Sequence, residues 1–256
     1  MDWYGKVVFI TGASSGIGSE LARQLAAKGA VLGLLARRKE ILDTLTIEIA
    51  QAGGTARTFA ADVIDEKAVH SAAESLRNDF GKIDILIANA GIGGRAKLPQ
   101  DIKTEDFARV VNVNLIGAVN AVTAVLPAMV ERKSGHLVAI SSLAAYGGLP
   151  KAAAYCASKA GMTTMFESLR VDLQGSGVAV TTIHPGFIKT PLTAGREAQM
   201  PFLMELPDAV QKIIHIIEQK KRIAAFPFPL STLVRLAQAF PAWLYDPIVK
   251  RNSFRE

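Results

Sequence analysis

The sequence has a single cysteine, Cys156, which excludes a disulfide within one chain and is consistent with a reducing compartment. It has no uninterrupted apolar run of the ~18 residues needed to span a bilayer. A strand pattern begins at Lys6 and leaves no room for a signal or transit peptide, so we expect a cytoplasmic protein. Its four histidines are scattered, without ligand spacing and without cysteine partners, and we predict no metal site.

The charge pattern lacks long runs of one sign. The formal net charge is +6, but no basic stretch is interleaved with aromatic residues, so we expect no nucleic-acid partner. A solvated surface rich in lysine and arginine explains the positive net charge. Binding of a phosphorylated cofactor or of an acidic membrane surface is also compatible with this charge. Ser141 and Ser142 lie outside any G-x-S-x-G motif, the sequence of the turn that carries the nucleophilic serine of α/β-hydrolases. This excludes a hydrolase of that type.

Short apolar runs alternate with longer helical patterns along the 256 residues. The predicted strands are 6–11, 30–36, 55–61, 83–88, 135–141, 177–184 and 222–226. The predicted helices are 16–28, 39–51, 66–80, 104–133 (with a capped start at Thr104), 153–174 and 207–220. This alternation favours parallel strands joined by right-handed crossovers. It predicts the α/β class, as a single doubly wound Rossmann-type domain with a parallel sheet of about seven strands and helices on both faces.

A glycine-rich turn, residues 11–18, links the first predicted strand to the first helix with the spacing G-x-x-x-G-x-G. Glycine permits a tight turn and close approach to a phosphate, and the helix N-terminus offers free N–H groups to an anion. The position between strand and helix favours a nucleotide site over a purely structural turn. The residues assigned to this site are Gly12, Ser14, Ser15, Gly16, Ile17 and Gly18.

The end of the second strand distinguishes the two nicotinamide cofactors. NAD sites usually carry an acid there, whereas this strand ends in Ala36, Arg37 and Arg38. A guanidinium pairs well with a phosphate and has no acceptor for a 2′-hydroxyl. We therefore favour NADP(H) over NAD(H). The alternative is that both arginines only solvate the start of the next helix.

The ends of the third and fourth strands provide further cofactor candidates. Asp62 and Val63 would lie beside the adenine, although Asp62 could instead cap the next helix, where Asp65 is the better cap. Asn89, Ala90 and Gly91 would form a compact bend beneath the nucleotide, and on their own they would be an ordinary turn.

Tyr155 and Lys159 lie four residues apart on the helix that follows the fifth strand. Side chains at i and i+4 share one helix face, so a phenol and an ammonium can point into one cleft. A nearby ammonium favours the phenolate and lowers the pKa of a phenol from its usual ~10. Ser142, at the end of the fifth strand, would hold a substrate oxygen while a hydride moves. Taken alone, such a pair is also common by chance.

In combination, these motifs resemble the short-chain dehydrogenase/reductase (SDR) family over residues 6–226. The resemblance rests on the glycine loop, Asn89-Ala90-Gly91, Ser142, Tyr155-x-x-x-Lys159 and Pro185-Gly186. It implies NAD(P)(H)-dependent oxidation of an alcohol or reduction of a carbonyl. It also implies that Tyr155 is the general acid/base, that Lys159 binds the nicotinamide ribose, and that Ser142 positions the substrate oxygen.

The resemblance reaches two further segments. Asn114 matches the residue that holds a relay water near the lysine, and the alternative is an asparagine that bonds backbone. Residues 184–190 would flank the nicotinamide carboxamide, and the alternative is an ordinary proline–glycine turn. From this segment we assign Pro185, Gly186, Ile188 and Thr190 to the cofactor.

The chain also departs from the family pattern. Many NADP-preferring members have a basic residue just before the second glycine, where this chain has Ser15. The contacts to the 2′-phosphate would therefore come from Arg37, Arg38 and Ser14. The chain also lacks the glycine-rich terminus of reductases that act on acyl-carrier thioesters, which puts that substrate and a tetramer contact in doubt. The family still implies a homo-oligomer, either a dimer or a tetramer.

We predict a catalytic domain that spans residues 1–226. Within it, the segment 190–207 is long for a connection, so we predict that it forms a lid over the substrate pocket. The apolar residues of this segment indicate a hydrophobic alcohol or carbonyl substrate. Other walls would come from residues 93–95 and 143–149. In the apolar helical extension, 227–256, we expect one apolar face to dock over the substrate mouth or against a partner subunit. This face comprises Leu233, Leu236, Ala237 and Phe240. The alternative is weak membrane contact, helped by Arg235, Lys250, Arg251 and Arg255.

The sequence thus predicts an NADP(H)-dependent SDR oxidoreductase that transfers a hydride between nicotinamide and a carbonyl or secondary alcohol carbon. The alternatives are a cofactor-binding scaffold that keeps the fold without the chemistry, and a membrane-surface protein whose tail is the main element. Cys156 points about 100° away from Tyr155 on the helix, so we expect a packed thiol rather than a nucleophile. We expect His215 to lie outside the apolar face of its helix.

Overall fold

The computed structural model describes residues 1–94, 98–195, 197, 200–237, 240–241, 243 and 245–247. Arg95, Lys250, Arg251 and Arg255, which the sequence analysis placed in a pocket wall or a basic tail, lie outside the described residues.

Seven parallel strands form one sheet in the order β3-β2-β1-β4-β5-β6-β7. Their bounds are β1 Val7–Thr11, β2 Val31–Ala36, β3 Thr55–Ala60, β4 Ile85–Ala88, β5 Gly135–Ile140, β6 Val178–Pro185 and β7 Ile223–Phe226. The order reverses direction between β1 and β4, which creates a switch point at the carboxyl ends of these two strands. The predicted fold class is confirmed.

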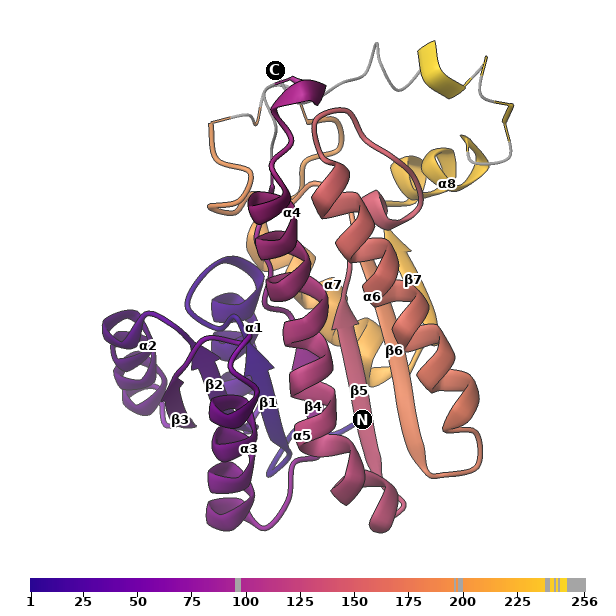
Figure 1. Ribbon diagram of the computed structural model, residues 1–256. Coiled ribbons are helices and arrows are strands. Elements are labelled where there is room, and N and C mark those ends of the chain that lie inside the picture. The colour runs from indigo at the N-terminus through magenta and orange to yellow at the C-terminus, as the bar shows by residue number, and fades with distance from the viewer. Residues whose placement is uncertain are drawn as a thin grey trace.

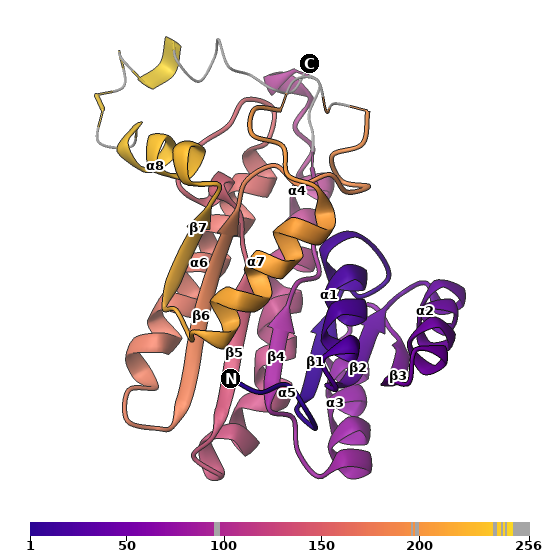
Figure 2. The same ribbon diagram turned by 180° about the vertical axis from the view of Figure 1, so that it is seen from behind.

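Helices cover both faces of the sheet (Figures 1 and 2). On one face lie α1 (Gly16–Ala27), α2 (Lys39–Gln51) and α7 (Leu206–Glu218). On the other lie α3 (Glu66–Phe80), α4 (Thr104–Val111), α5 (Gly117–Glu131) and α6 (Ala153–Asp172). A last helix, α8 (Phe228–Ala237), follows β7 and lies beyond the carboxyl ends of the strands.

Two hydrophobic cores result, because alternate strand residues point to opposite faces. Ile10 and Leu34 belong to the core beneath α1, α2 and α7, whereas Phe9 and Leu35 belong to the core beneath α3, α5 and α6. In α7 the apolar face is buried as predicted, and His215 lies outside it with an exposed side chain.

The predicted helix 104–133 differs from the structure in three respects. Thr104 is the first helical residue and no side chain caps the helix, so the predicted cap at Thr104 is wrong; Glu105 and Asp106 in the first turn face the positive end of the helix dipole instead. A π-helical turn, Asn112–Ile116, separates α4 from α5. The helix ends at Glu131.

The combined stretch Thr104–Glu131 is long and apolar enough, by length and composition, to cross a membrane. In the structure it packs against α3, α6, β4 and β5. We therefore interpret it as part of the helical layer that covers the sheet.

The predicted apolar face of the tail does not pack as a unit over the substrate cavity in the single chain, and its contact with a partner subunit stays a prediction. Leu233 and Leu236 are exposed, and Phe240 is 40% exposed, whereas Ala237 is buried. The residues of α8 that face the body of the protein are Leu230 and Val234, which lie one turn apart. The helix therefore presents two apolar faces, and the sequence pattern selected the outer one.

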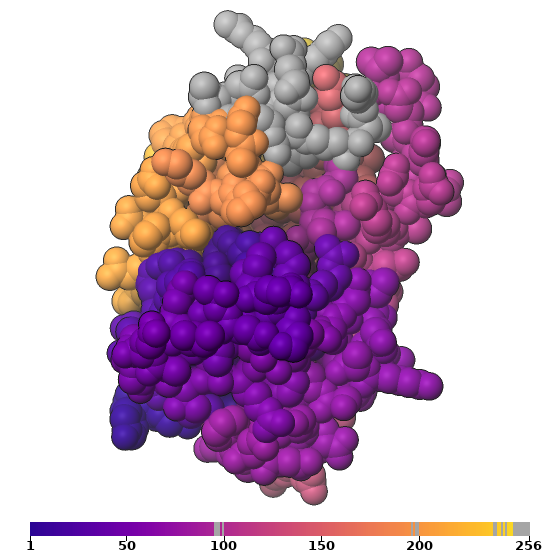
Figure 3. Space-filling view, turned by 90° about the vertical axis from the view of Figure 1, so that its left-hand side faces the viewer, coloured from indigo at the N-terminus to yellow at the C-terminus, as the bar shows by residue number. Residues whose placement is uncertain are grey.

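The carboxyl ends of the strands, the glycine loop and the segment after β6 gather at one end of the molecule. Figure 3 shows a hollow there, between the orange segment that follows β6 and the magenta segment that follows β4. Most of the predicted site residues lie at this end.

Candidate active site

The glycine loop is pinned to the end of β4 by hydrogen bonds. The side chain of Asn89 donates to the carbonyls of Thr11 (3.0 Å) and Gly12 (3.2 Å), and the Thr11 hydroxyl accepts from the backbone N–H groups of Asn89 and Ala90, both at 3.1 Å. Asn89 therefore shapes the loop, a role that the sequence analysis did not separate from an ordinary turn. Thr11 was missed, although its place at the strand end was visible.

Two glycines of the loop are required by geometry. Gly12 has φ of +69°, a conformation that L side chains rarely adopt. A Cβ on Gly18 would lie 2.3 Å from the carbonyl oxygen of Gly12 and 2.6 Å from Nδ2 of Asn89. The first turn of α1 can therefore approach the loop only because residue 18 has no side chain.

This arrangement fits the phosphates of a dinucleotide. The side chain of the N-cap residue Ser15 makes no hydrogen bond to the first-turn N–H groups of α1, and no acidic residue lies in that turn. Free N–H groups and the positive end of the helix dipole favour an anion at this position. The cleft in front of the loop has a volume of about 320 Å³ and runs from Arg37 and Asp62 to Lys159.

Two arginines stand at the end of β2. Arg38 donates to the hydroxyl (3.0 Å) and carbonyl (3.3 Å) of Ser14, which holds its guanidinium against the glycine loop. Arg37 lies 3.7 Å from the carboxylate of Asp62, with both side chains partly exposed. Asp65, not Asp62, caps α3, by accepting from the N–H of Ala68 at 3.0 Å. The alternative of Asp62 as the helix cap is therefore wrong.

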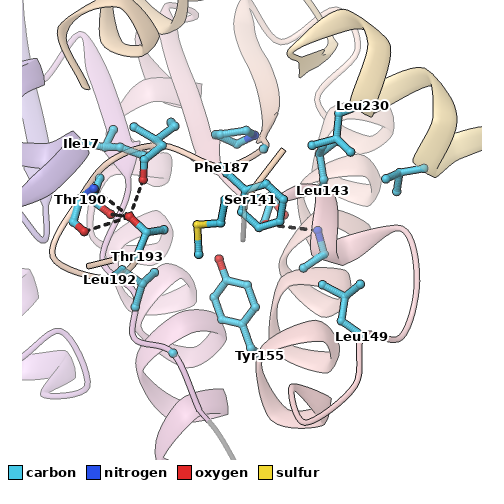
Figure 4. A pocket seen from close by; sticks show the side chains of 18 of the residues that line it. Ile17, Ser141, Leu143, Leu149, Tyr155, Phe187, Thr190, Leu192, Thr193 and Leu230 are labelled. Carbon is cyan, nitrogen blue, oxygen red and sulfur yellow. Dashed lines mark hydrogen bonds between the residues drawn. The ribbon is translucent and has the colours of Figure 1, made fainter. Parts of the chain in front are cut away.

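Tyr155 lies where two cavities meet. Its side chain lines the cofactor-type cleft and also a second, mostly apolar cavity of about 190 Å³, which we call the substrate cavity. Figure 4 shows the phenol hydroxyl pointing into this cavity, with Leu143 and Leu230 on one side and Thr190 and Leu192 on the other. Ser142 lines the substrate cavity, and Lys159 lines the cleft.

Lys159 is buried on the same helix face. Its ammonium donates to the carbonyl of Ile140, at the end of β5, at 2.8 Å. Burial lowers the pKa of Lys159 from 10.5 to about 8, because the low-dielectric surroundings penalise the charged form. A Cβ on Gly91 would lie 3.4 Å from this nitrogen, so the bend after β4 passes directly by the amine.

The hydroxyl of Ser142 accepts a hydrogen bond from the N–H of Ala144 at 3.1 Å. This bond uses a lone pair of the oxygen and leaves the hydroxyl proton for another acceptor. Beneath Ser142, the neighbouring Ser141 bonds Thr163 (2.8 Å), and Thr163 bonds His184 (3.1 Å). Ser141 lines both cavities, and sequence reasoning missed this buried chain.

Asn114 sits buried in the π-helical turn. Its amide accepts from the N–H of Ile92 (2.8 Å) and donates to the carbonyl of Ile92 (3.0 Å) and to the hydroxyl of Ser158 (2.9 Å). The sequence analysis left open whether Asn114 holds a relay water or forms hydrogen bonds to backbone groups, and the two bonds to Ile92 are of the second kind. Because Ser158 precedes Lys159, Asn114 ties the loop after β4 to the helix that carries Tyr155 and Lys159.

The structure divides the predicted cofactor residues between the two cavities. Those that line the cleft are Gly12, Ser14, Ser15, Gly16, Ile17, Arg37, Arg38, Asp62, Val63, Asn89, Ala90, Gly91, Tyr155, Lys159 and Thr190. Pro185, Gly186 and Ile188 line the substrate cavity instead, together with Thr190 and Ile17, which line both. Gly18 lies behind the loop and supports it without lining either space.

The segment after β6 contributes to the wall of the substrate cavity, and two backbone hydrogen bonds fasten its base. Met204 donates to the carbonyl of Phe187, and Lys189 donates to the carbonyl of Met204, both at 3.0 Å. Between these points, Leu192, Thr193 and Met200 line the cavity. Of the predicted walls, Gly93, Gly94, Leu143, Ala144 and Leu149 do so as well.

The histidine and cysteine side chains do not form a cluster with acidic residues in the described part of the chain. Among the described residues, no group of three or more histidine, cysteine, aspartate or glutamate side chains could hold a metal ion. His184 is buried and bonded to Thr163, and burial lowers its pKa to about 4. Cys156 is buried against Ala144 and Ala152, as a packed thiol would be.

The family model for short chain dehydrogenases matches residues 6–201. An uncharacterized oxidoreductase of Myxococcus xanthus is 42% identical over 246 residues, which cover 96% of this chain and 97% of the relative. A fatty acyl-CoA reductase of Acinetobacter baylyi is 34% identical and covers 86% of this chain and 76% of its own length.

Solved structures show the same fold. A xylitol dehydrogenase with bound NAD+ has a TM-score of 0.81 at 27% identity, covering 88% of this chain and 98% of its own. A metagenomic short-chain oxidoreductase in complex with NADP has a TM-score of 0.75 at 30% identity, covering 88% and 97%. On the motifs, the fold and these matches, the chain belongs to the short-chain dehydrogenase/reductase family and is an NAD(P)-dependent oxidoreductase.

Proposed function

We propose that this oxidoreductase uses NADP(H) to interconvert a hydrophobic carbonyl compound and its alcohol. The observation that carries the proposal is the position of Tyr155, which lines both the cofactor-type cleft and the apolar substrate cavity. A group at that junction can reach a substrate oxygen while the substrate carbon faces the cleft.

The chain's own residues provide the acid–base chemistry in this proposal. When bound, the nicotinamide supplies or accepts the hydride. Ser142 donates its hydroxyl proton in a hydrogen bond to the substrate oxygen, because its lone pair is already engaged by Ala144. In the reductive direction Tyr155 gives its proton to that oxygen. The buried cation Lys159 in the same cleft stabilises the phenolate that remains.

Three residues support a preference for NADP(H). Ser14, Arg37 and Arg38 line the adenosine end of the cleft, and the Arg38–Ser14 hydrogen bonds hold one guanidinium at the loop. The ion pair between Arg37 and Asp62 is exposed, and such pairs contribute only about 0–1 kcal/mol. Arg37 can therefore exchange this partner for a phosphate at little cost. The NADP complex of a structural neighbour is consistent with this choice.

The lining of the substrate cavity supports a hydrophobic substrate. Leu143, Leu149, Phe187, Met200 and Leu230 contribute to a mostly apolar wall. The relative from Acinetobacter baylyi is named for a fatty acyl-CoA, which has an apolar chain. A screen of NADPH oxidation over ketones, aldehydes, quinones and steroids tests the proposal. No oxidation of NADPH with any carbonyl compound would argue for a cofactor-binding scaffold.

We also propose that residues 190–207 act as a lid and that the extension 227–256 completes the same domain, because Leu192, Met200, Leu230 and Val234 all line the substrate cavity. A homo-oligomer and a cytoplasmic location remain part of the proposal, and light scattering after gel filtration tests the first.

The outer face of α8 favours contact with a membrane as a second feature. Phe228 is 78% exposed, and Leu233 and Leu236 of the same helix are also exposed, as is Trp243 beyond its end. Arg235 is exposed as well, with its guanidinium over the ring of Tyr146. An apolar face with a cation suits the surface of an anionic bilayer. Sedimentation with acidic and neutral lipid vesicles, with the full chain and with a variant lacking residues 230–256, tests this contact. Equal sedimentation of both proteins would contradict it.

A further inference from the structure

A third cavity, which we call the outer cavity, adjoins the substrate cavity. It has a volume of about 220 Å³, and Gly94 and Leu149 line both spaces. A Cβ on Gly94 would lie 2.5 Å from Cγ2 of Val110, so residue 94 has no space for a side chain at this part of the wall. Gly94 and Leu149 therefore form part of the wall of both cavities, which places the outer cavity next to the substrate cavity.

The wall of the outer cavity is apolar near the partition. It includes Phe107, Ala153 and Ala154, with Ile102 at its edge. Ala154 immediately precedes Tyr155, so the cavity lies against the first turn of the helix that carries the phenol. Ile102 is 52% exposed, and a bound apolar chain would cover it.

Four charged side chains also line the outer cavity, and they are not equivalent. The carboxylate of Asp101 accepts from the N–H of Leu98 at 3.0 Å, and Asp106 pairs with Arg109 at 3.4 Å. Within the described part of the chain, no hydrogen bond or ion pair engages the ammonium groups of Lys103 and Lys151. Asp106 thus has a cationic partner and Asp101 a neutral one, whereas Lys103 and Lys151 have no ion-pair partner among the described residues.

We propose that the outer cavity is a substrate subsite for an anionic terminus. The substrate would then be a carbonyl or alcohol compound whose reacting end lies at Tyr155 and whose apolar chain ends in a carboxylate or phosphate near Lys103 and Lys151. The inference rests on the proposed reductase function.

The test compares matched aldehydes over a series of chain lengths, each with a terminal carboxylate, its methyl ester or a phosphate monoester. At the best length we expect KM for the ester to exceed KM for the acid about four- to twenty-fivefold, because two exposed ion pairs each contribute a factor of about two to five. The ratio should fall as ionic strength rises. Because a phosphate monoester carries more negative charge than a carboxylate, tighter binding of the phosphate is expected from charge alone, whereas tighter binding of the carboxylate would identify a carboxylate as the terminus.

Variants locate the effect. The double variant Lys103→Gln, Lys151→Gln should reduce the ester-to-acid KM ratio to below about two, and arginine at both positions should restore it. Lys67→Gln, an exposed lysine on α3, should retain the wild-type ratio. A ratio near one in the wild type, or a ratio that survives the double glutamine variant, would overturn the subsite.

Calorimetric titration of the same acids and esters into the protein with NADP+ separates this proposal from the function. If neither these aldehydes nor any carbonyl compound of the screen is reduced, the proposed function fails. The subsite then stands only if the acid still binds more tightly than the ester and loses this advantage in the double glutamine variant.

Discussion

Arg38 is the most informative position for the cofactor preference. Its guanidinium is already fixed to Ser14 by hydrogen bonds of 3.0 and 3.3 Å, so little side-chain freedom is lost when a 2′-phosphate binds beside it. A hydrogen bond to a charged group contributes about 1.5–3 kcal/mol. Arg38→Ala should therefore weaken NADPH binding roughly ten- to a hundredfold, at about 1.4 kcal/mol for each factor of ten.

Arg37 should show a smaller effect, because its guanidinium must leave the carboxylate of Asp62 at 3.7 Å to reach a phosphate. Asp62→Asn removes this competition and should tighten NADPH binding up to about fivefold, the upper range for an exposed pair. Binding is measured by fluorescence titration of NADPH and NADH at two salt concentrations. Arg23→Ala, which breaks an exposed pair with Glu48 on the first two helices, is the control.

The affinity for NADH decides the interpretation. If Arg38→Ala weakens NADPH and NADH binding by the same factor, the arginine only shapes the loop and the 2′-phosphate reasoning is refuted. A change restricted to NADPH, which shrinks at high salt, supports the contact.

Three further changes test the supports of the site. Gly18→Ala places a Cβ 2.3 Å from the carbonyl of Gly12 and should destabilise the fold by about 1–3 kcal/mol and weaken cofactor binding; Gly148→Ala, with nothing within 4 Å, should do neither in urea denaturation and cofactor titration. Asn114→Ala leaves the N–H and C=O of Ile92 without their partners and should cost about 2–4 kcal/mol of unfolding free energy; a loss below about 0.5 kcal/mol would contradict a tying role. Because the pKa of Lys159 is lowered from 10.5 to about 8, the unfolded chain binds more protons between these values and stability rises with pH across that window, by up to roughly 3 kcal/mol. Urea denaturation should show this rise for the wild type relative to Lys159→Met, and parallel pH profiles of the two proteins would refute it.

The sequence predicted the sheet and most of the site because each rests on a local pattern. Short apolar runs that alternate with helical patterns predict buried parallel strands, and the position of the loop 11–18 between a strand and a helix indicates a nucleotide site. Tyr155 and Lys159 needed only helical spacing to be placed on one face. The doubly wound topology then brought the ends of β1, β2, β4 and β5 together.

Tertiary contacts decided the rest. Leu233 and Leu236 form as good an apolar face as Leu230 and Val234, and only the position of α8 over the cavity selects the second pair. The π-helical turn at Asn114 depends on bonds to Ile92 and Ser158, which are distant in sequence. The chain from Ser141 through Thr163 to His184 joins three elements, and none of the three residues stands out in its own segment.

The central claim is that Tyr155 transfers the proton while the cleft beside it holds NADP(H). Single-turnover reduction of a substrate from the screen, with NADPH bound to wild type and to Tyr155→Phe, tests it most directly. The account predicts that the variant binds NADPH with an affinity within about threefold of wild type but loses about a hundred- to ten-thousandfold in the rate of hydride transfer, since general acid catalysis contributes roughly 10²–10⁴. A variant that binds NADPH and transfers hydride at the wild-type rate would contradict the account.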